Sequence, residues 1–284
     1  MLSNDLIKLI EQAGVVGAGG AGFPTHKKLV KDVDYLLING AECEPLLQVD
    51  QNIAKKYAKE LVETLEEILK SLNIKQGVFG LKGKYIESIA ALEKAIAGKK
   101  NIGIHKLPDI YPSGDEVVLI HECTGKIIPE GQLPITKNVI VCNMETLFNI
   151  SKALKGKGVT HKYVTVTGEV HNRGTYLVPI GTKVVDLLNV VKPSIEDYVI
   201  LEGGPMTGNL IDKDKPISKT TNGIIFLPKL HKLVQKKQRP DMDSVKRVMS
   251  ACSQCDYCTV LCPRHQLGHN VQPHKLMNAF ANGL

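Results

Sequence analysis

The order of apolar segments in the first 150 residues constrains the fold more than any other feature. Short apolar runs alternate there with segments of helical periodicity, and the runs cover residues 35–38, 77–81 and 101–105. The longest helical segment starts at Asp50 and repeats apolar residues every three or four positions as far as Leu72. Strands that alternate with helices predict a mostly parallel sheet covered by helices. Such a sheet binds ligands at the carboxyl ends of its strands, where residues 39–45 follow the first one.

A glycine-rich segment, Gly14–Thr25, precedes the first predicted strand. It holds five glycines in nine residues, and such a backbone can turn tightly and bring bare N–H groups against a ligand. Gly17, Gly19 and Gly22 fit the spacing G-x-G-x-x-G, but the dinucleotide fingerprint must follow a strand and open a helix. Here a helical segment, residues 4–13, comes first. We therefore predict a ligand-binding loop that is not of the ordinary Rossmann kind.

Further polar residues stand where predicted strands end or predicted helices begin. They are Asn39, Glu42, Glu44, Asp115, Glu116, Asn143 and Thr146. The polar ends of strands can present side chains to a ligand. An Asn or Thr at a helix start can equally cap the helix, and a single loop acid can simply be solvated. The residues alone leave both interpretations open.

A change of composition at residues 155–158 predicts a domain boundary. Residues 162–190 contain two runs with β-branched alternation, separated by a turn and followed by a helical segment at 184–191, a pattern that fits a small β-grasp module. We therefore predict three domains. They cover residues 1–155, 156–228 and 229–284.

The cysteine run in the last of these domains is the most specific motif of the chain. Cys252, Cys255, Cys258 and Cys262, followed by Pro263, have the spacing C-x₂-C-x₂-C-x₃-C-P of iron–sulfur proteins. Zinc also accepts four thiolates, but its sites favour two separated pairs. In two-cluster ferredoxins the fourth cysteine ligates the other cluster. Either Cys262 completes a single [4Fe–4S] cluster locally, or a second cluster-binding segment is missing after Leu284.

Composition excludes several classes of protein. An apolar fraction of 43% and a charged fraction of 23% are typical of a globular chain, without a run long enough to span a membrane or a signal peptide. We expect a cytoplasmic protein, either free or peripheral on the inner face of the cell membrane. Seven cysteines in such a chain favour metal chemistry over disulfides. A net charge of +7, with 5% aromatic residues and no Trp, predicts no nucleic-acid partner.

Taken together, the motifs resemble a known family. Gly17–Thr25 followed by Asn39–Pro45 is similar to the flavin-binding subunit of respiratory complex I. It resembles even more the C subunit of Rnf-type ferredoxin:NAD oxidoreductases and their soluble relatives, the cobalamin reductase of propanediol utilisation and the electron-transfer protein linked to D-proline reductase. Other segments match the family in the same order: 111–116, 141–146, 203–208 and 252–263. Residues 162–190 resemble its SLBB (soluble-ligand-binding β-grasp) module.

The resemblance implies an α/β fold with a Rossmann-like FMN-binding domain of the complex I flavoprotein type, a β-grasp module and a helical ferredoxin-like segment. It implies that NADH reduces FMN and that electrons pass to a [4Fe–4S] cluster and then to a redox partner, such as a ferredoxin, a reductase or Rnf-like membrane subunits. The cofactor-binding residues it implies are Gly17, Gly19, Gly20, Gly22, Lys28, Asn39, Glu42, Asp115, Asn143 and Thr146. The catalytic residues it implies are Glu44 and Glu116.

Two departures from the complex I pattern leave a second hypothesis open. Ala18 stands where the complex I loop has an arginine, and Ala41 stands where it has an aspartate. A chain that kept the cluster but lost the NADH site would be an electron carrier or an assembly subunit. A zinc-binding, ligand-sensing β-grasp protein is a third hypothesis.

Overall fold

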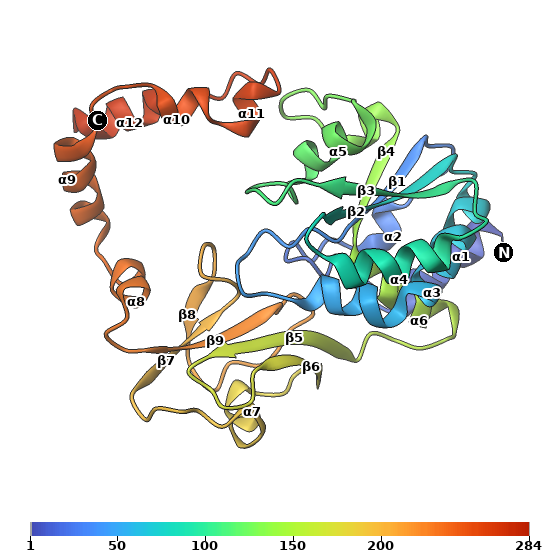
Figure 1. Ribbon diagram of the computed structural model, residues 1–284, viewed down its shortest axis with the longest axis horizontal. Helices are drawn as coiled ribbons and strands as arrows, with labels where there is room; N and C mark the ends of the chain where they lie inside the picture. The colour runs from blue at the N-terminus through green and yellow to red at the C-terminus, as the bar shows by residue number, and fades with distance from the viewer. Residues whose placement is uncertain (1, 284) are drawn as a thin grey trace.

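The computed structural model describes residues 2–283 and contains two sheets with a helical arm at the C-terminal end (Figure 1). The first sheet is parallel and has the strand order β3-β2-β1-β4. Its strands are β1 (Tyr35–Asn39), β2 (Gln76–Lys82), β3 (Ile102–Leu107) and β4 (Val139–Asn143). The register of β1 and β4 places Asn39 opposite Asn143. Two of the predicted site residues therefore meet at the carboxyl edge of this sheet.

Helices cover both faces of the first sheet, because alternate residues of each strand enter different cores. In β1, Leu36 and Ile38 join the larger core, whereas Leu37 joins the smaller one. The larger core is packed by α1 (Ser3–Gln12), α3 (Val49–Leu72), α4 (Ile86–Ile96) and α6 (Met144–Leu154). The smaller core is packed by α5 (Glu116–Thr124). Two short elements, α2 (Thr25–Lys28) and η1 (Pro134–Lys137), complete this part.

The second sheet is mixed and has the order β6-β5-β9-β7-β8. Its strands are β5 (His161–Gly168), β6 (Gly174–Pro179), β7 (Tyr198–Glu202), β8 (Asn209–Ile211) and β9 (Gly223–Pro228). The central strands β5 and β9 run parallel, and the other neighbours are antiparallel. One helix, α7 (Val184–Val191), packs Val184 and Val191 against this sheet in a core of its own.

The chain then forms an arm that runs from β9 back to α5 (Figure 1). It consists of α8 (Lys232–Lys237), α9 (Asp241–Ala251), α10 (Tyr257–Val260), α11 (Pro263–Gln266) and α12 (Pro273–Ala281). Neither α9 nor α12 has a buried residue. Between residues 2 and 283, no helix is both long and apolar enough to cross a membrane.

Candidate functional site

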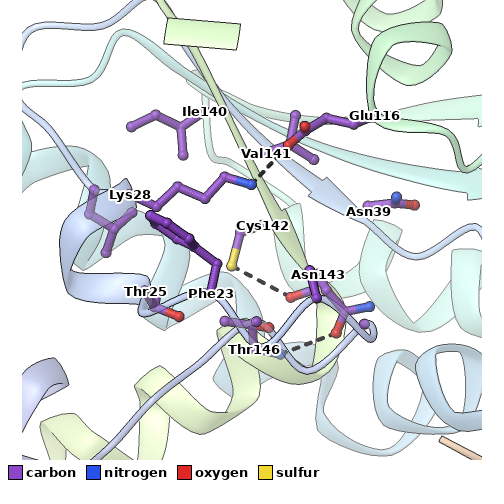
Figure 2. A pocket seen from close by; sticks show the side chains of 14 residues that line it. Phe23, Thr25, Lys28, Asn39, Glu116, Ile140, Val141, Cys142, Asn143 and Thr146 are labelled. Carbon is purple, nitrogen blue, oxygen red and sulfur yellow. Dashed lines mark hydrogen bonds and ion pairs between the residues drawn. The ribbon is translucent and has the colours of Figure 1, made fainter. Parts of the chain in front are cut away.

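A cavity of about 310 Å³ lies between the glycine-rich loop and the carboxyl ends of β1 and β4 (Figure 2). This volume is within the range of small-molecule sites. It brings together seven of the predicted residues, namely Gly17, Gly19, Lys28, Asn39, Glu116, Asn143 and Thr146. Apolar side chains, including Phe23 and Val141, supply much of the remaining wall. The predicted loop, strand ends and helix start therefore form one concave site.

The two asparagines at the sheet edge are both fixed by the protein. Asn39 donates from Nδ2 to the Gly114 carbonyl (2.8 Å) and accepts at Oδ1 from the Ala41 N–H (3.0 Å). Asn143 caps α6, because its Oδ1 accepts from the N–H groups of the next helical turn. Its Nδ2 donates to Asp50 Oδ2 (2.8 Å). Each amide keeps one further N–H, and Asn39 Oδ1 also keeps a lone pair, so both residues could hold a ligand while serving these structural roles.

Backbone hydrogen bonds close the glycine-rich loop. The Gly17 N–H donates to Phe23 O (2.9 Å), and the Gly22 N–H donates to Gly17 O (3.1 Å). Gly20 and Gly22 have φ values of +127° and +65°, a region that side chains disfavour. These two glycines shape the loop and do not line the cavity. A Cβ at Gly19 would lie 3.4 Å from Asn143 Nδ2, so a side chain there would enter the site.

One ion pair lies at the cavity between α2 and α5. Lys28 Nζ is 2.8 Å from Glu116 Oε1, and both side chains are partly exposed (Figure 2). Glu116 is the first residue of α5. The preceding residue, Asp115, caps that helix and contacts Arg264 of the arm at 2.8 Å. Asp115 therefore stands beside the cavity without lining it.

A second cavity of about 220 Å³ shares Gly19, Asn39 and Asn143 with the first. Glu42, Glu44 and Asp50 give it an acidic wall. Glu42 Oε1 accepts from the Val49 N–H (2.7 Å) at the start of α3. Burial raises the pKa of Glu42 to about 7, although backbone N–H groups of α3 act in the opposite direction.

The second carboxyl oxygen of Glu42, Oε2, is buried and has no hydrogen-bond partner among the described residues. Burial, together with the nearby Glu42 and Glu145, also raises the pKa of Asp50 well above its usual value. These two acids therefore hold protons more tightly than exposed carboxyls do.

Glu44 makes contacts that its place in the sequence did not predict. Its carboxylate accepts hydrogen bonds from the Met206 N–H (2.9 Å), the Thr207 N–H (2.6 Å) and the Thr207 hydroxyl. Gly204 is equally close, since a Cβ there would lie 2.1 Å from Glu44 Oε2. Glu44 thus joins the acidic loop to the turn between β7 and β8, besides lining the second cavity.

The four cysteines of the run lie on the arm. Cys252 ends α9, Cys258 lies in α10 and Cys262 precedes α11. Hydrogen bonds from the Tyr257 N–H and the Ser253 side chain lower the pKa of Cys255, which favours the thiolate that a metal requires. Within residues 2–283, no three His, Cys, Asp or Glu side chains are gathered closely enough to hold a metal ion.

The donor set nevertheless fits an iron–sulfur cluster. It supplies four thiols at ferredoxin spacing on short helices and turns. Ligands of this kind reach their final geometry when the metal binds, because binding and folding are coupled. Away from the arm, burial raises the pKa of Cys123 and Cys142 to about 12, so these thiols are packed and unreactive.

The parallel sheet, the glycine-rich loop and the amide pair at its edge define a cofactor-binding α/β protein, to which the arm adds an iron–sulfur motif. Residues 10–152 match the family Complex1_51K, described as the Nuo51 FMN-binding domain. Residues 251–284 match the 4Fe-4S dicluster domain. The chain belongs to the Nuo51 FMN-binding family, which confirms the resemblance identified from its motifs.

Curated relatives agree with this assignment. The cobalamin reductase PduS of Citrobacter freundii is 41% identical over 273 residues, which are 95% of this chain and 60% of that protein. A component of the Na⁺-translocating ferredoxin:NAD⁺ oxidoreductase complex of Acetobacterium woodii is 33% identical over 282 residues, or 96% of this chain and 61% of that component. The chain therefore spans less than two thirds of the length of these relatives.

Solved structures show the same fold. An NAD⁺-reducing [NiFe]-hydrogenase in the H₂-reduced state matches with a TM-score of 0.72 and 18% identity, over 98% of this chain and 53% of that one. The air-oxidised state gives a TM-score of 0.71 and 20% identity, over 99% and 53%.

Proposed function

We propose that this chain is the flavin- and cluster-binding part of an NADH-dependent electron-transfer protein. FMN, when bound, supplies the exchange between a hydride from NADH and single electrons. The family match to an FMN-binding domain supports the flavin, and the cysteine run supports a [4Fe–4S] cluster as the next carrier. The printed names of the relatives, a cobalamin reductase and a component of a ferredoxin:NAD⁺ oxidoreductase, support NADH-linked chemistry.

The observation that carries the proposal is the 310 Å³ cavity at the carboxyl edge of the parallel sheet. We assign the flavin to it, because backbone N–H groups of a glycine-rich loop suit a phosphate. Asn39, Asn143 and Thr146 offer the amide and hydroxyl partners that a ribityl chain needs. Lys28 and Glu116 bind one another across the site and would orient the bound groups. Hydride transfer itself needs orientation and no protein acid or base.

Substitution of Gly19 tests this assignment. Gly19→Val places a branched side chain beside Asn143, inside the cavity. We expect FMN affinity, measured by quenching of flavin fluorescence, to fall at least tenfold, while the iron content after anaerobic reconstitution stays unchanged. Gly103→Val on β3 is the matched control, since its Cβ would meet nothing within 4 Å. Normal FMN affinity in Gly19→Val would refute the flavin assignment.

We infer three functional modules along the chain. Residues 1–155 would bind FMN and NADH, 156–228 would form an SLBB β-grasp module, and 229–284 would carry the cluster. The order β6-β5-β9-β7-β8, with a parallel central pair and one helix, supports the β-grasp assignment. Because relatives include members of ion-translocating complexes, the partners would be redox proteins or membrane subunits, and the chain would sit in the cytoplasm or on the inner membrane face.

One observation favours the alternative of an electron carrier without a working NADH site. The Glu44 carboxylate, assigned to catalysis, is held by three donors in the turn between β7 and β8. In the carrier alternative, the protein binds FMN but NADH does not bleach it under anaerobic conditions. In our first proposal, NADH bleaches the bound flavin as soon as the solutions are mixed, or within a few turnovers.

A further inference from the structure

Lys162 of β5 is buried where the second sheet meets the glycine-rich loop. Its side chain is 2% exposed. The ammonium donates to Asn222 Oδ1 (2.7 Å), to the Ala18 carbonyl (3.3 Å) and to the carboxylate of Glu145. An ammonium has three donors, and these three acceptors use all of them. Lys162 therefore joins three segments that are distant in the sequence.

Glu145, in the first turn of α6, completes this contact. Its side chain is 1% exposed, and its Oε1 accepts from the Tyr163 N–H at 2.9 Å. Both carboxyl oxygens of Glu145 thus bind residues of β5. The start of α6 lines the flavin cavity through Thr146. These contacts of Glu145 bind it to the second sheet.

Ala18 is held at both of its backbone polar atoms. Its N–H donates to Thr146 Oγ1 (2.9 Å), and its carbonyl accepts from Lys162. A second lysine of the same module, Lys219, donates to the Gly14 carbonyl at 2.6 Å. Lys219, from the connection before β9, and Lys162 of β5 therefore fix the glycine-rich loop at its beginning and in its middle.

The Ala18 carbonyl and the Gly19 N–H belong to one peptide unit. Because that unit is planar and trans, its C=O and N–H bonds point in opposite directions. Fixing the carbonyl on Lys162 therefore also fixes the direction of the Gly19 N–H. Gly19 lines both the first and the second cavity.

We propose that Lys162 is a positioning residue for cofactor binding: by holding the Ala18 carbonyl, it directs the Gly19 N–H toward the anionic part of FMN. This inference rests on the proposed flavin site and extends it to the second sheet. The β-grasp module then shapes the flavin cavity and is more than an appended domain. Lys162 acts through the loop backbone and does not itself line either cavity.

Several titratable groups surround Lys162, and they determine which substitution is informative. Glu145 of α6 contacts it directly, while Glu42 and Asp50 act on it from the α3 side. Lys152 and Tyr163 are the other titratable groups that interact with Glu145. Removing Lys162 alone would leave Glu145 buried without its cation, which destabilises a fold. The informative variant therefore neutralises both residues.

The test compares Lys162→Met/Glu145→Gln with Lys183→Met. Lys183 lies in the same module but is exposed and pairs with Asp214 at 3.2 Å. We expect the double variant to bind FMN about 10- to 100-fold more weakly, the loss of one charge-assisted hydrogen bond. In flavin-free protein its Ala18 amide, which is buried and donates to Thr146 Oγ1, should exchange hydrogen faster, while the α3 amides stay protected. The Lys183 variant should match the wild type in both measurements.

Wild-type affinity and wild-type exchange at Ala18 in the double variant would overturn the inference. Should the double variant not fold, Lys162→Arg takes its place, because Glu145 then keeps a cation while the planar guanidinium moves its donors away from Ala18. Weaker binding and faster Ala18 exchange in Lys162→Arg support the inference, and unchanged values contradict it. Failure of the wild type to bind FMN would refute the proposed function. The exchange measurement would still test whether Lys162 positions the loop, because it is made on flavin-free protein.

Discussion

Single side chains in the site serve the fold and the cavity together. Asn143 shows this most clearly, since it caps α6, binds Asp50 and still lines both cavities. The sequence leaves open whether Asn143 caps a helix or binds a ligand. These two roles therefore do not exclude one another. Asp115 is different, because capping α5 and pairing with Arg264 use both of its oxygens.

Gly114 is a residue at which a methyl group should disturb the site. A Cβ there would lie 2.0 Å from the Ala41 carbonyl and 2.9 Å from Cys43 Sγ. Since backbone must move to make room, Gly114→Ala should lower the free energy of unfolding by about 1–3 kcal/mol. It should also weaken FMN binding, because Asn39 donates to the Gly114 carbonyl. Denaturant titration checks the first effect, and Gly103→Ala, which has open space, is the control.

The raised pKa of Glu42 makes stability depend on pH. Burial moves this pKa from 4.5 to about 7 in the folded protein. Between these values the folded state binds more protons than the unfolded state, so the unfolding free energy falls as the pH rises. Glu42→Gln cannot ionise, and it should lose less stability than the wild type between about pH 5 and pH 7, by roughly 1–3 kcal/mol.

Denaturant titration at both pH values measures this difference. Glu63→Gln on the exposed face of α3 is the control and should follow the wild type. An equal loss of stability in wild type and Glu42→Gln would show that Glu42 does not titrate in this range.

At the scale of elements, the arm is attached beside the first cavity. Arg264 of α11 contacts Asp115, His269 Nε2 lies 2.8 Å from the Ile128 carbonyl, and the Asn270 N–H donates to Glu130 Oε2 at 3.0 Å. Adjacent residues at the start of α5 thus serve two sites, because Asp115 holds the arm and Glu116 pairs with Lys28 at the cavity. This attachment would keep the cysteine run near the flavin.

Loss of the Arg264 contact should loosen the arm selectively. A partly exposed ion pair contributes about 0.2–1 kcal/mol, so Arg264→Gln should raise amide hydrogen exchange in residues 263–270 roughly two- to fivefold. FMN affinity should not change, since Arg264 lines neither cavity. Arg247→Gln, on the exposed arm helix α9, provides the comparison. Unchanged exchange in Arg264→Gln would mean that the other two contacts suffice to hold the arm.

Elements with a clear local pattern were predictable. The periodicity from Asp50 to Leu72 predicted α3 (Val49–Leu72), and residues 184–191 predicted α7. The strands β7 and β8 were not predicted; β8 has only three residues, too few to show a period. Contacts between modules also escaped prediction, as with Glu44 and Thr207, which lie 163 positions apart. Periodicity reports which face of an element is buried and does not identify its distant partner.

At the scale of the whole molecule, the proposed modules form an electron path. The parallel sheet and glycine-rich loop would hold FMN, the second sheet would fix that loop through Lys162, and the arm would carry the cluster beside α5. Each step uses residues that the fold brings together from different segments. The family match supports the flavin domain, and the path from NADH to the cluster is the central claim.

Anaerobic titration with NADH tests this claim most directly. The protein is loaded with FMN and with iron and sulfide, and flavin absorption and the iron–sulfur signal are followed together in wild type and Gly19→Val. We predict that NADH bleaches the wild-type flavin and reduces its cluster, whereas Gly19→Val keeps an oxidised cluster that dithionite still reduces. Cluster reduction by NADH in Gly19→Val without bound flavin, or a wild-type flavin that NADH leaves oxidised, would contradict this electron path.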